Sequence, residues 1–224
     1  MTALLIAALA AYLIGSLSFA VIVSRAVGLA DPRTYGSKNP GATNVLRSGN
    51  RAAAIATLVL DALKGYVPVL LAVLYGPRWG IAEGGTALIG LAAFVGHLWP
   101  VFFRFQGGKG VATAAGVLFG IDPVLGAATL ASWVLIAAFF RYSSLASIVA
   151  ALYAPFHQML FNGGGPVAGA ITVMSLLLIW RHSANISKLL AGTESKLGQK
   201  AAPAAPPAPH AKPHSHHHHH KHGK

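Results

Sequence analysis

The chain has 224 residues, of which 54% are hydrophobic and only 10% are charged, whereas about 25% of the residues of a soluble domain carry a charge. This composition excludes an ordinary soluble domain and indicates lipid as the solvent. The absence of cysteine excludes disulfides and thiolate chemistry. The net charge of +12 does not indicate a nucleic-acid partner, because the bases lie in short clusters between apolar runs and form no aromatic-studded basic face.

Apolar runs long enough to cross a membrane follow one another along the chain, and they predict an all-α, polytopic membrane bundle. A span needs about 20 apolar residues, because each residue adds about 1.5 Å across roughly 30 Å of hydrocarbon. The runs cover residues 3–24, 53–75, 84–103, 111–121, 124–140, 143–161 and 166–180. The fourth run is too short for a perpendicular crossing and the seventh is marginal. Six or eight spans therefore stay open, although seven fits the charges best.

Basic and non-basic loops alternate between these runs. Lysine and arginine gather in residues 25–52, in residues 104–110, at Arg141 and in residues 181–200. The loops on the other side carry few bases or none. Because cytoplasmic loops hold the excess of Lys and Arg, seven spans predict an N-terminus outside the cell and a C-terminus inside it.

The last part of the chain differs in composition from the rest. We expect residues 1–200 to form one integral membrane domain and residues 201–224 to form a disordered tail. The tail is rich in Ala and Pro and then in His, a composition that cannot bury a core. The run His216–His220 is either a native His-rich tail or a purification tag. No catalytic metal site is predicted in the tail or elsewhere in the chain.

A first polar cluster lies in the basic loop after the first run. Its hydrogen-bonding and basic residues are Ser37, Asn39, Thr43, Asn44 and Arg47. The simple interpretation is a solvated loop, because Asn-Pro-Gly at residues 39–41 is a strong turn signal. The density of polar side chains in so short a segment instead favours a polar pocket at the membrane surface.

A second cluster joins the third and fourth runs, where Gly107, Gly108, Lys109 and Gly110 precede an apolar helix. Glycines let backbone N–H groups turn toward an anion, and the following helix N-terminus adds positive potential. We expect a phosphate cradle, although the spacing is not that of a P-loop. The alternative is a glycine-rich turn with a lysine that sets topology. His97, near the end of the third run, is either a structural donor or a titratable functional group.

Two further groups of polar residues complete the set of candidates. Asp61 and Lys64 are three residues apart in the second run, so they share a helix face and are predicted to form an ion pair. The alternative is that the pair also connects the bundle to the polar site. Arg181, His182 and Asn185 share one face of a predicted amphipathic continuation of the last helix, for which a basic helix on anionic lipid is the alternative. The clusters at the loops fall on one side of the predicted bundle, which favours a single site.

Four segments together resemble the PlsY family, the bacterial membrane acyl-phosphate:glycerol-3-phosphate acyltransferases, over about residues 4–200. The segments are GSKNPGATNVLR (36–47), DALKG (61–65), GHLWPVFFRFQGGKGVAT (96–113) and RHSANISKLLAGTESKLG (181–198). One departure is Lys188, where an arginine is expected. The resemblance implies a helical bundle in the bacterial inner membrane, a site that faces the cytoplasm, and neither metal nor cofactor. It also implies acyl phosphate and glycerol 3-phosphate as substrates, lysophosphatidate as product, and an upstream enzyme that forms acyl phosphate.

This reaction joins two anions, so Arg47 and Lys109 are the expected phosphate-binding cations. Ser37, Asn185 or the glycine-loop N–H groups are candidates to stabilise the oxyanion. The base is either His97 or the phosphate of the donor, and a covalent intermediate on Ser37 lacks a predicted partner base. His182, Asp61 and Lys64 are expected to support the site. The alternative class is a small transporter or phosphate-binding membrane protein. Acyl chain length and oligomeric state are not predicted.

Overall fold

The computed structural model describes residues 1–199, and every regular element in this part of the chain is helical. The fold class is therefore all-α, as predicted. The predicted tail, residues 201–224, lies outside the described residues. The helices are α1 (Thr2–Gly15), α2 (Phe19–Ala26), α3 (Ala42–Leu46), α4 (Arg51–Tyr75), α5 (Glu83–Leu98), α6 (Val111–Ile121), α7 (Pro123–Phe140), α8 (Ser143–Phe161), α9 (Pro166–Arg181) and α10 (Ser183–Leu190), with 3₁₀ turns at Gly76–Trp79 and Val101–Phe103.

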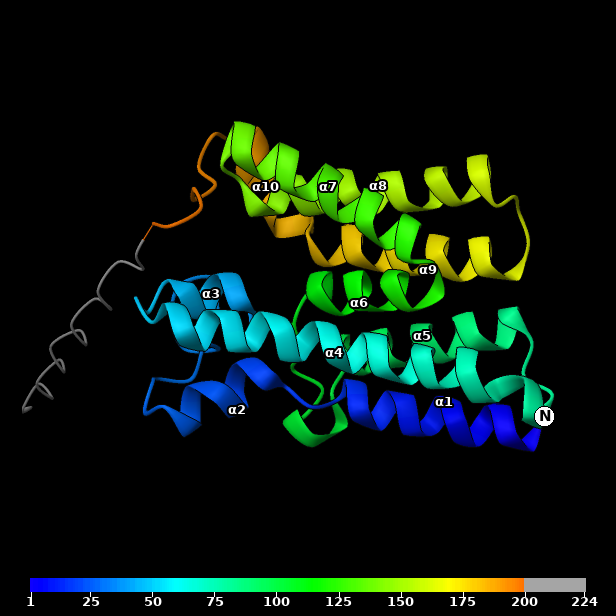
Figure 1. Ribbon diagram of the computed structural model, residues 1–224. Coiled ribbons are helices and arrows are strands. Elements are labelled where there is room, and N and C mark those ends of the chain that lie inside the picture. The colour runs from blue at the N-terminus through cyan, green and yellow to red at the C-terminus, as the bar shows by residue number, and fades with distance from the viewer. Residues whose placement is uncertain (200–224) are drawn as a thin grey trace, which may run out of the picture.

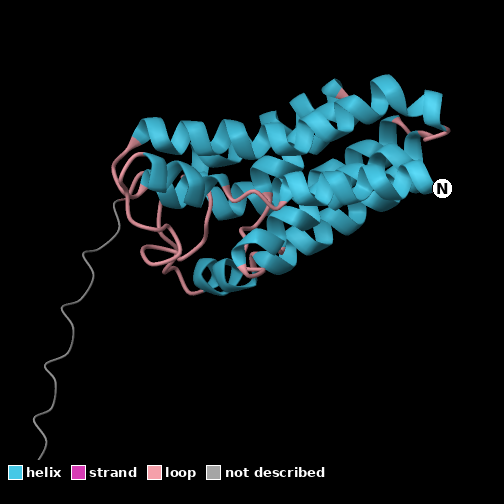
Figure 2. Cartoon of the chain, turned by 90° about the horizontal axis from the view of Figure 1, so that it is seen from below, coloured by secondary structure: helices cyan, strands magenta, loops and turns pink. Residues whose placement is uncertain are grey.

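The long helices lie side by side along one direction, so the bundle has two ends (Figure 1). The N-terminus is at one end, whereas α3, α10 and the last described residues are at the other, where long irregular loops gather (Figures 1 and 2). We call the latter the loop end. Small residues allow close packing inside the bundle. A Cβ atom at Gly116 of α6 would lie 1.9 Å from the carbonyl oxygen of Ala62 of α4, so this crossing requires glycine.

The first predicted run, residues 3–24, does not form a single straight helix. It is divided into α1 and α2, which are bent by 41°. The segment between them frees the carbonyl of Leu17, which accepts a hydrogen bond of 2.7 Å from Lys64 Nζ. This contact between distant segments compensates a broken backbone inside the bundle, where an unpaired carbonyl is costly.

The predicted continuation of the last helix is present as α10, but α10 is bent by 56° from α9. The third run, residues 84–103, corresponds to the candidate span Glu83–Phe103. Within it, α5 stops at Leu98 before Pro100 and a 3₁₀ turn follows, because the residue before a proline disfavours helix. The other predicted runs differ from the observed helices by two residues at most.

Among the helices of residues 1–199, four are long and apolar enough to cross a membrane, or up to six if each bent pair is one span. The apolar helix α6 has only 11 residues. Large apolar side chains are exposed on the outer surface, such as Leu5, Phe139 and Leu160, and lipid is the solvent in which such a surface is stable. The number of seven spans and the orientation of the termini stay predictions.

Candidate functional site

The loop between α2 and α4 is organised around the buried side chain of Asn44. Its Nδ2 donates to the carbonyls of Pro32, at 2.7 Å, and Tyr35, at 3.1 Å. Its Oδ1 accepts from the backbone N–H of Ser37 at 3.0 Å. The amide of Asn44 is thus occupied by contacts within the loop, which differs from the phosphate contact expected from the sequence. The side chain instead fixes where Ser37 lies.

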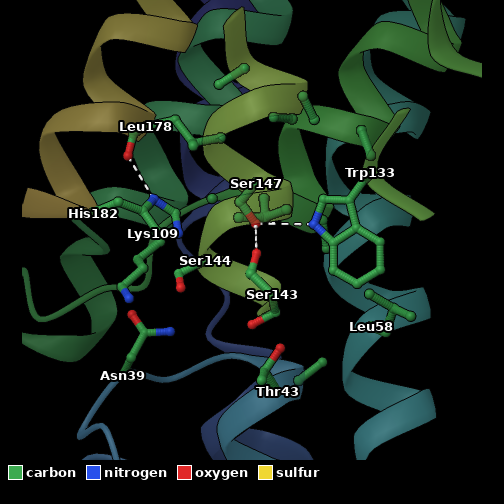
Figure 3. Close-up of a pocket in the computed structure, with 18 of the residues that line it drawn as sticks. Asn39, Thr43, Leu58, Lys109, Trp133, Ser143, Ser144, Ser147, Leu178 and His182 are labelled. Atoms are coloured by element: carbon green, nitrogen blue, oxygen red, sulfur yellow. Dashed lines mark hydrogen bonds between the residues drawn. The ribbon is translucent and has the colours of Figure 1, made fainter. Parts of the chain in front are cut away.

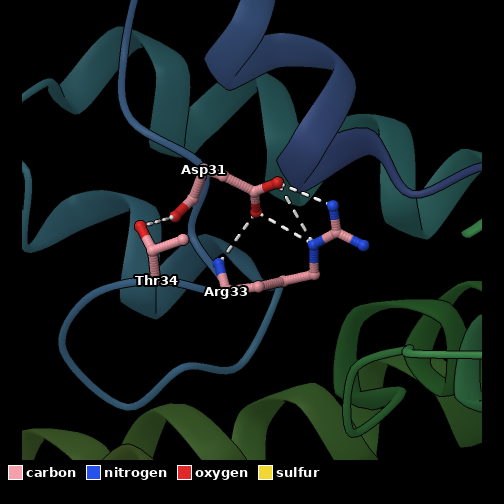
Figure 4. A network of polar contacts seen from close by, with 3 residues as sticks. All are labelled: Asp31, Arg33 and Thr34. Carbon is pink, nitrogen blue, oxygen red and sulfur yellow. Dashed lines mark hydrogen bonds and ion pairs between the residues drawn. The ribbon is translucent and has the colours of Figure 1, made fainter.

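The same loop is stabilised by Asp31, Arg33 and Thr34 (Figure 4). Arg33 Nη2 donates to Asp31 Oδ2 at 2.6 Å, and Thr34 Oγ1 donates to the carbonyl of Asp31 at 2.8 Å. The hydrogen bonds from Arg33 lower the pKa of the Asp31 carboxyl, although partial burial acts against this. Arg33 also lies over the ring of Phe103 at 6.0 Å from its centroid. These partly exposed contacts join the first loop to the loop after α5.

The glycine loop before α6 is held by Arg181 at the end of α9. Arg181 Nη2 donates to the carbonyl of Gly107 at 2.8 Å, and Nε donates to that of Gly108 at 3.1 Å. The loop reaches α6 through Gly110, whose φ of +84° favours glycine. Gly110 and the first helical residues Val111 and Ala112 line a cavity. The positive end of the α6 backbone therefore faces this cavity, a position that favours anions.

This cavity has a volume of about 660 Å³ and lies at the loop end. It is bordered by the loop between α2 and α4, by the glycine loop and by helices α8 and α10. Predicted site residues that line it are Ser37, Asn39, Thr43, Asn44, Arg47, Lys109, Gly110, His182 and Asn185. Figure 3 shows the side chains of Asn39 and Lys109 pointing toward one another. The cavity continues between the helices along apolar side chains that include Leu58, Leu118, Leu130, Ala154 and Met174. Its polar end and its apolar interior suit an amphipathic ligand.

Lys109 and Arg47 place positive charge at the polar end. Lys109 Nζ donates to Asn185 Oδ1, and Arg47 Nη2 donates to Ser195 Oγ. Burial lowers the pKa of Lys109 to about 8, nearby Arg47 lowers it too, and Glu194 opposes these effects. A lysine in this state is positively charged at neutral pH but loses its charge in mildly alkaline solution.

A carboxylate fixes the residues around these cations. Glu194 Oε1 accepts from Asn185 Nδ2 and from Ser144 Oγ, each at 2.7 Å. Asn185 therefore bridges Lys109 and Glu194. His182 is buried, and its Nδ1 donates to the carbonyl of Leu178 at 2.8 Å, since a carbonyl only accepts. On the opposite wall, Trp133 donates to Ser147 at 3.0 Å (Figure 3).

The remaining predicted site residues do not line the cavity; two of them belong to the glycine loop and three lie behind it. They are Asp61, Lys64, His97, Gly107 and Gly108. The predicted ion pair is confirmed, with Lys64 Nζ at 2.7 Å from Asp61 Oδ1. A Cβ atom at Gly108 would lie 2.3 Å from His97 Nε2, so the imidazole lies directly beneath this glycine. Within residues 1–199, no group of three His, Asp or Glu side chains could hold a metal ion.

A sequence model described as glycerol-3-phosphate acyltransferase matches residues 5–192. The chain belongs to this family. Glycerol-3-phosphate acyltransferases of Ralstonia nicotianae and Cupriavidus metallidurans are 66% and 63% identical over 196 residues, covering 88% of this chain in both cases and 95% and 97% of those proteins. These matches confirm the resemblance inferred from the sequence, and they do not favour the transporter alternative.

Solved structures of the family have the same fold. The crystal structure of the integral membrane glycerol 3-phosphate acyltransferase PlsY in its glycerol 3-phosphate form has a TM-score of 0.82 and 39% identity, covering 88% of this chain and 96% of that one. The lysophosphatidic acid form has a TM-score of 0.79 and 38% identity, covering 87% and 95%. The described bundle is thus the fold of a membrane acyltransferase.

The sequence reasoning missed several residues that build the site of this family member. Glu194, Ser195 and Ser144 hold Asn185 and Arg47 in place. Glu194 was detectable, because it is the one acidic residue that follows Asp122 in the chain and lies among bases. Ser144 gave no signal, since it is one of several serines in an apolar helix.

Proposed function

We propose that this chain transfers an acyl group from acyl phosphate to the 1-hydroxyl of sn-glycerol 3-phosphate, which forms lysophosphatidate and phosphate. The observation that carries the proposal is the cavity itself, whose cationic end at Arg47 and Lys109 continues into an apolar interior. Phosphate groups suit the first part and an acyl chain suits the second. The glycerol 3-phosphate and lysophosphatidic acid forms of PlsY support the acceptor and the product.

Arg47 and Lys109 bind the phosphate groups of the two substrates in this proposal. Both side chains line the cavity, and charge-assisted hydrogen bonds to phosphate are the strong ones. Gly110 at the start of α6, with Asn39 and Thr43, contributes neutral donors around the anions. Asn44 acts through the backbone of Ser37, because its own amide is occupied within the loop.

In the reaction, the acceptor hydroxyl attacks the carbonyl carbon of the mixed anhydride. The bond from this carbon to the phosphate oxygen then breaks, and the phosphate leaves. Ser37 Oγ and the backbone N–H group of Gly110, which both line the cavity, stabilise the developing oxyanion, while Asn185 holds Lys109. Placing two anions side by side accounts for much of the rate, since positioning alone can contribute ~7–11 kcal/mol at its limit.

The proton of the attacking hydroxyl goes to the donor's phosphate in our proposal. His97 is the other candidate base, but its imidazole is beneath Gly108 and does not line the cavity. A general base must come within about 3 Å of the proton it removes, directly or through one water. In the part of the chain that the structure describes, Ser37 hydrogen-bonds through its backbone N–H to Asn44 Oδ1 and its hydroxyl has no neighbouring base as a hydrogen-bond partner, so we do not propose an acyl-enzyme.

We also propose seven spans, with the N-terminus outside and the loop end in the cytoplasm of a bacterial inner membrane. The described termini lie at opposite ends of the bundle (Figure 1), which favours an odd number of crossings. Seven results if each bent pair and α6 count as one span alongside the four long helices. Arg25, Arg47 and Arg51 near the loop end fit the positive-inside rule. An enzyme that forms acyl phosphate must then act upstream.

The test is transfer by purified protein in detergent. Palmitoyl phosphate and glycerol 3-phosphate should yield lysophosphatidate and an equal amount of phosphate, whereas palmitoyl coenzyme A should give no product. The control is Lys109→Ala, which keeps the loop glycines but removes the charge at the cavity. Absence of lysophosphatidate from folded wild-type protein, or equal rates with the coenzyme A donor, would overturn the proposal.

A further inference from the structure

A cluster of buried polar side chains lies beneath the glycine loop and outside the cavity. Its members are Asp61 and Lys64 of α4, His97 of α5 and Thr113 of α6, each no more than 7% exposed. None of them lines the cavity. Charged groups are costly to bury inside a membrane bundle. Apolar residues would pack there at lower cost, so we expect these polar side chains to have a function other than packing.

The ion pair connects α4 to the break between α1 and α2. Lys64 Nζ lies 2.7 Å from Asp61 Oδ1 and donates to the carbonyl of Leu17 at 2.7 Å. Leu17 lies between α1 and α2. One ammonium group thus pairs with the carboxylate and donates to a carbonyl that the bend leaves without a helical partner.

The hydrogen bonds of Thr113 set the orientation of His97. Thr113 Oγ1 donates to the carbonyl of Asp61 at 3.0 Å. A hydroxyl has a single proton to donate, so the contact of 3.2 Å between Thr113 Oγ1 and His97 Nδ1 requires Nδ1 to be the donor. Asp61 Oδ1, at 3.7 Å from Nδ1, favours the same tautomer. His97 Nε2 then lacks a proton in the neutral ring.

His97 in turn lies against the glycine loop, at the place where this loop approaches the first loop. Its carbonyl accepts from the N–H of Gly108 at 3.2 Å. A Cβ atom at Gly108 would meet His97 Nε2 at 2.3 Å and the carbonyl oxygen of Pro40 at 2.8 Å. The imidazole, the glycine loop and the first loop therefore meet at one point. A tilt of the ring would displace the backbone that carries Lys109.

We infer that Asp61, Lys64 and Thr113 are positioning residues. They orient His97, and His97 in turn holds the glycine loop where Lys109 can contact the anionic ligand. The inference rests on the proposed function for the identity of that ligand, glycerol 3-phosphate. The competing account is an ion pair and a threonine that only stabilise the helix packing. The two accounts differ in one respect: only the first expects a change at Thr113 to lower the affinity for the ligand without a matching loss of protein stability.

The chain offers a matched control for Thr113. Thr57 of α4 is also fully buried, and its hydroxyl donates within its own helix to the carbonyl of Ala53 at 2.8 Å. Replacing either threonine by valine removes one hydroxyl and keeps the shape. Only Thr113→Val removes a contact to His97. Thr113→Ser keeps that contact and serves as the conservative rescue.

The experiment measures three quantities for wild type, Thr113→Val, Thr113→Ser and Thr57→Val in detergent: the thermal midpoint, the affinity for glycerol 3-phosphate by calorimetry, and kcat/KM for transfer. We expect similar midpoints for the two valine variants. Thr113→Val alone should weaken binding and lower kcat/KM, toward the ~100-fold loss that a displacement of about 1 Å can cause. Thr113→Ser should recover most of both.

The ion pair is tested by removing both charges together in Asp61→Asn with Lys64→Met, since a single change leaves an unpaired buried charge. We expect a folded protein with a raised KM for glycerol 3-phosphate. Wild-type affinity and kcat/KM in Thr113→Val or in this double variant would overturn the inference, as would an equal loss in Thr57→Val. Wild-type protein that neither binds glycerol 3-phosphate nor forms product would instead contradict the proposed function.

Discussion

The pKa of Lys109 predicts how substrate binding should change with pH. Burial lowers this pKa from 10.5 to about 8, so the ammonium loses its charge as the pH rises through about 8. An anionic ligand requires the charged form. Glycerol 3-phosphate itself does not change charge in this range, because the second pKa of a phosphate monoester is near 6. The alkaline limb of binding therefore reports the enzyme rather than the ligand.

The magnitude follows from the fraction of enzyme that carries the charge. With a pKa of about 8, about half of the free enzyme is charged at pH ~8 and about one tenth at pH ~9. The apparent Kd is the intrinsic Kd divided by this fraction. Affinity for glycerol 3-phosphate should thus fall about fivefold between these two pH values, and about tenfold for each further unit.

The assay is calorimetric titration of glycerol 3-phosphate into detergent-solubilised protein at several pH values from ~6.5 to ~9.5. Lys109→Arg is the matched control, because a guanidinium stays charged throughout this range. Its affinity should be nearly independent of pH, whatever its absolute value. A wild-type affinity that stays constant up to pH ~9.5, or an identical alkaline limb in Lys109→Arg, would refute the assignment of Lys109 as the titrating phosphate ligand.

Arg47→Ala should lower kcat/KM by about ten- to a hundredfold, since a hydrogen bond to a charged group contributes ~1.5–3 kcal/mol; initial rates that match wild type would contradict a role in phosphate binding. His97→Asn should retain more kcat than His97→Gln or His97→Ala, because an Asn amide can donate to Thr113 as Nδ1 does. Losses in both amide variants as large as in His97→Ala would indicate base catalysis instead. Alkaline phosphatase fused after Gly198 should be inactive, because the basic loops predict a cytoplasmic C-terminus, and periplasmic phosphatase activity would reverse the proposed topology.

Much of the bundle was predictable because the membrane imposes a length on each apolar run. The runs at 53–75, 124–140 and 143–161 become α4, α7 and α8 with small changes at their ends. The bends were not predictable in the same way. Residues 16–18 are small or apolar, and the break there is compensated by Lys64, which lies 47 residues further along the chain. Pairing between distant segments is invisible to a local pattern.

The composition of the candidate site was predictable in part, because Ser37, Arg47, Lys109 and Asn185 were all named from the sequence and all line one cavity. Their individual roles were less accessible. Asn44 has the same chemistry as Asn39, but its amide is used within the loop. Which asparagine faces a ligand depends on where the loop backbone turns, and composition does not contain this information.

Four of the basic residues divide into two groups according to where each charge lies. Lys64 and Arg181 bind backbone carbonyls, one at the break between α1 and α2 and the other in the glycine loop. Such carbonyls require a donor because water is scarce in a membrane bundle. Arg47 and Lys109 instead line the cavity. Lys64 and Arg181 therefore stabilise the irregular backbone around the site. That backbone in turn places Arg47 and Lys109 where two anionic substrates can meet.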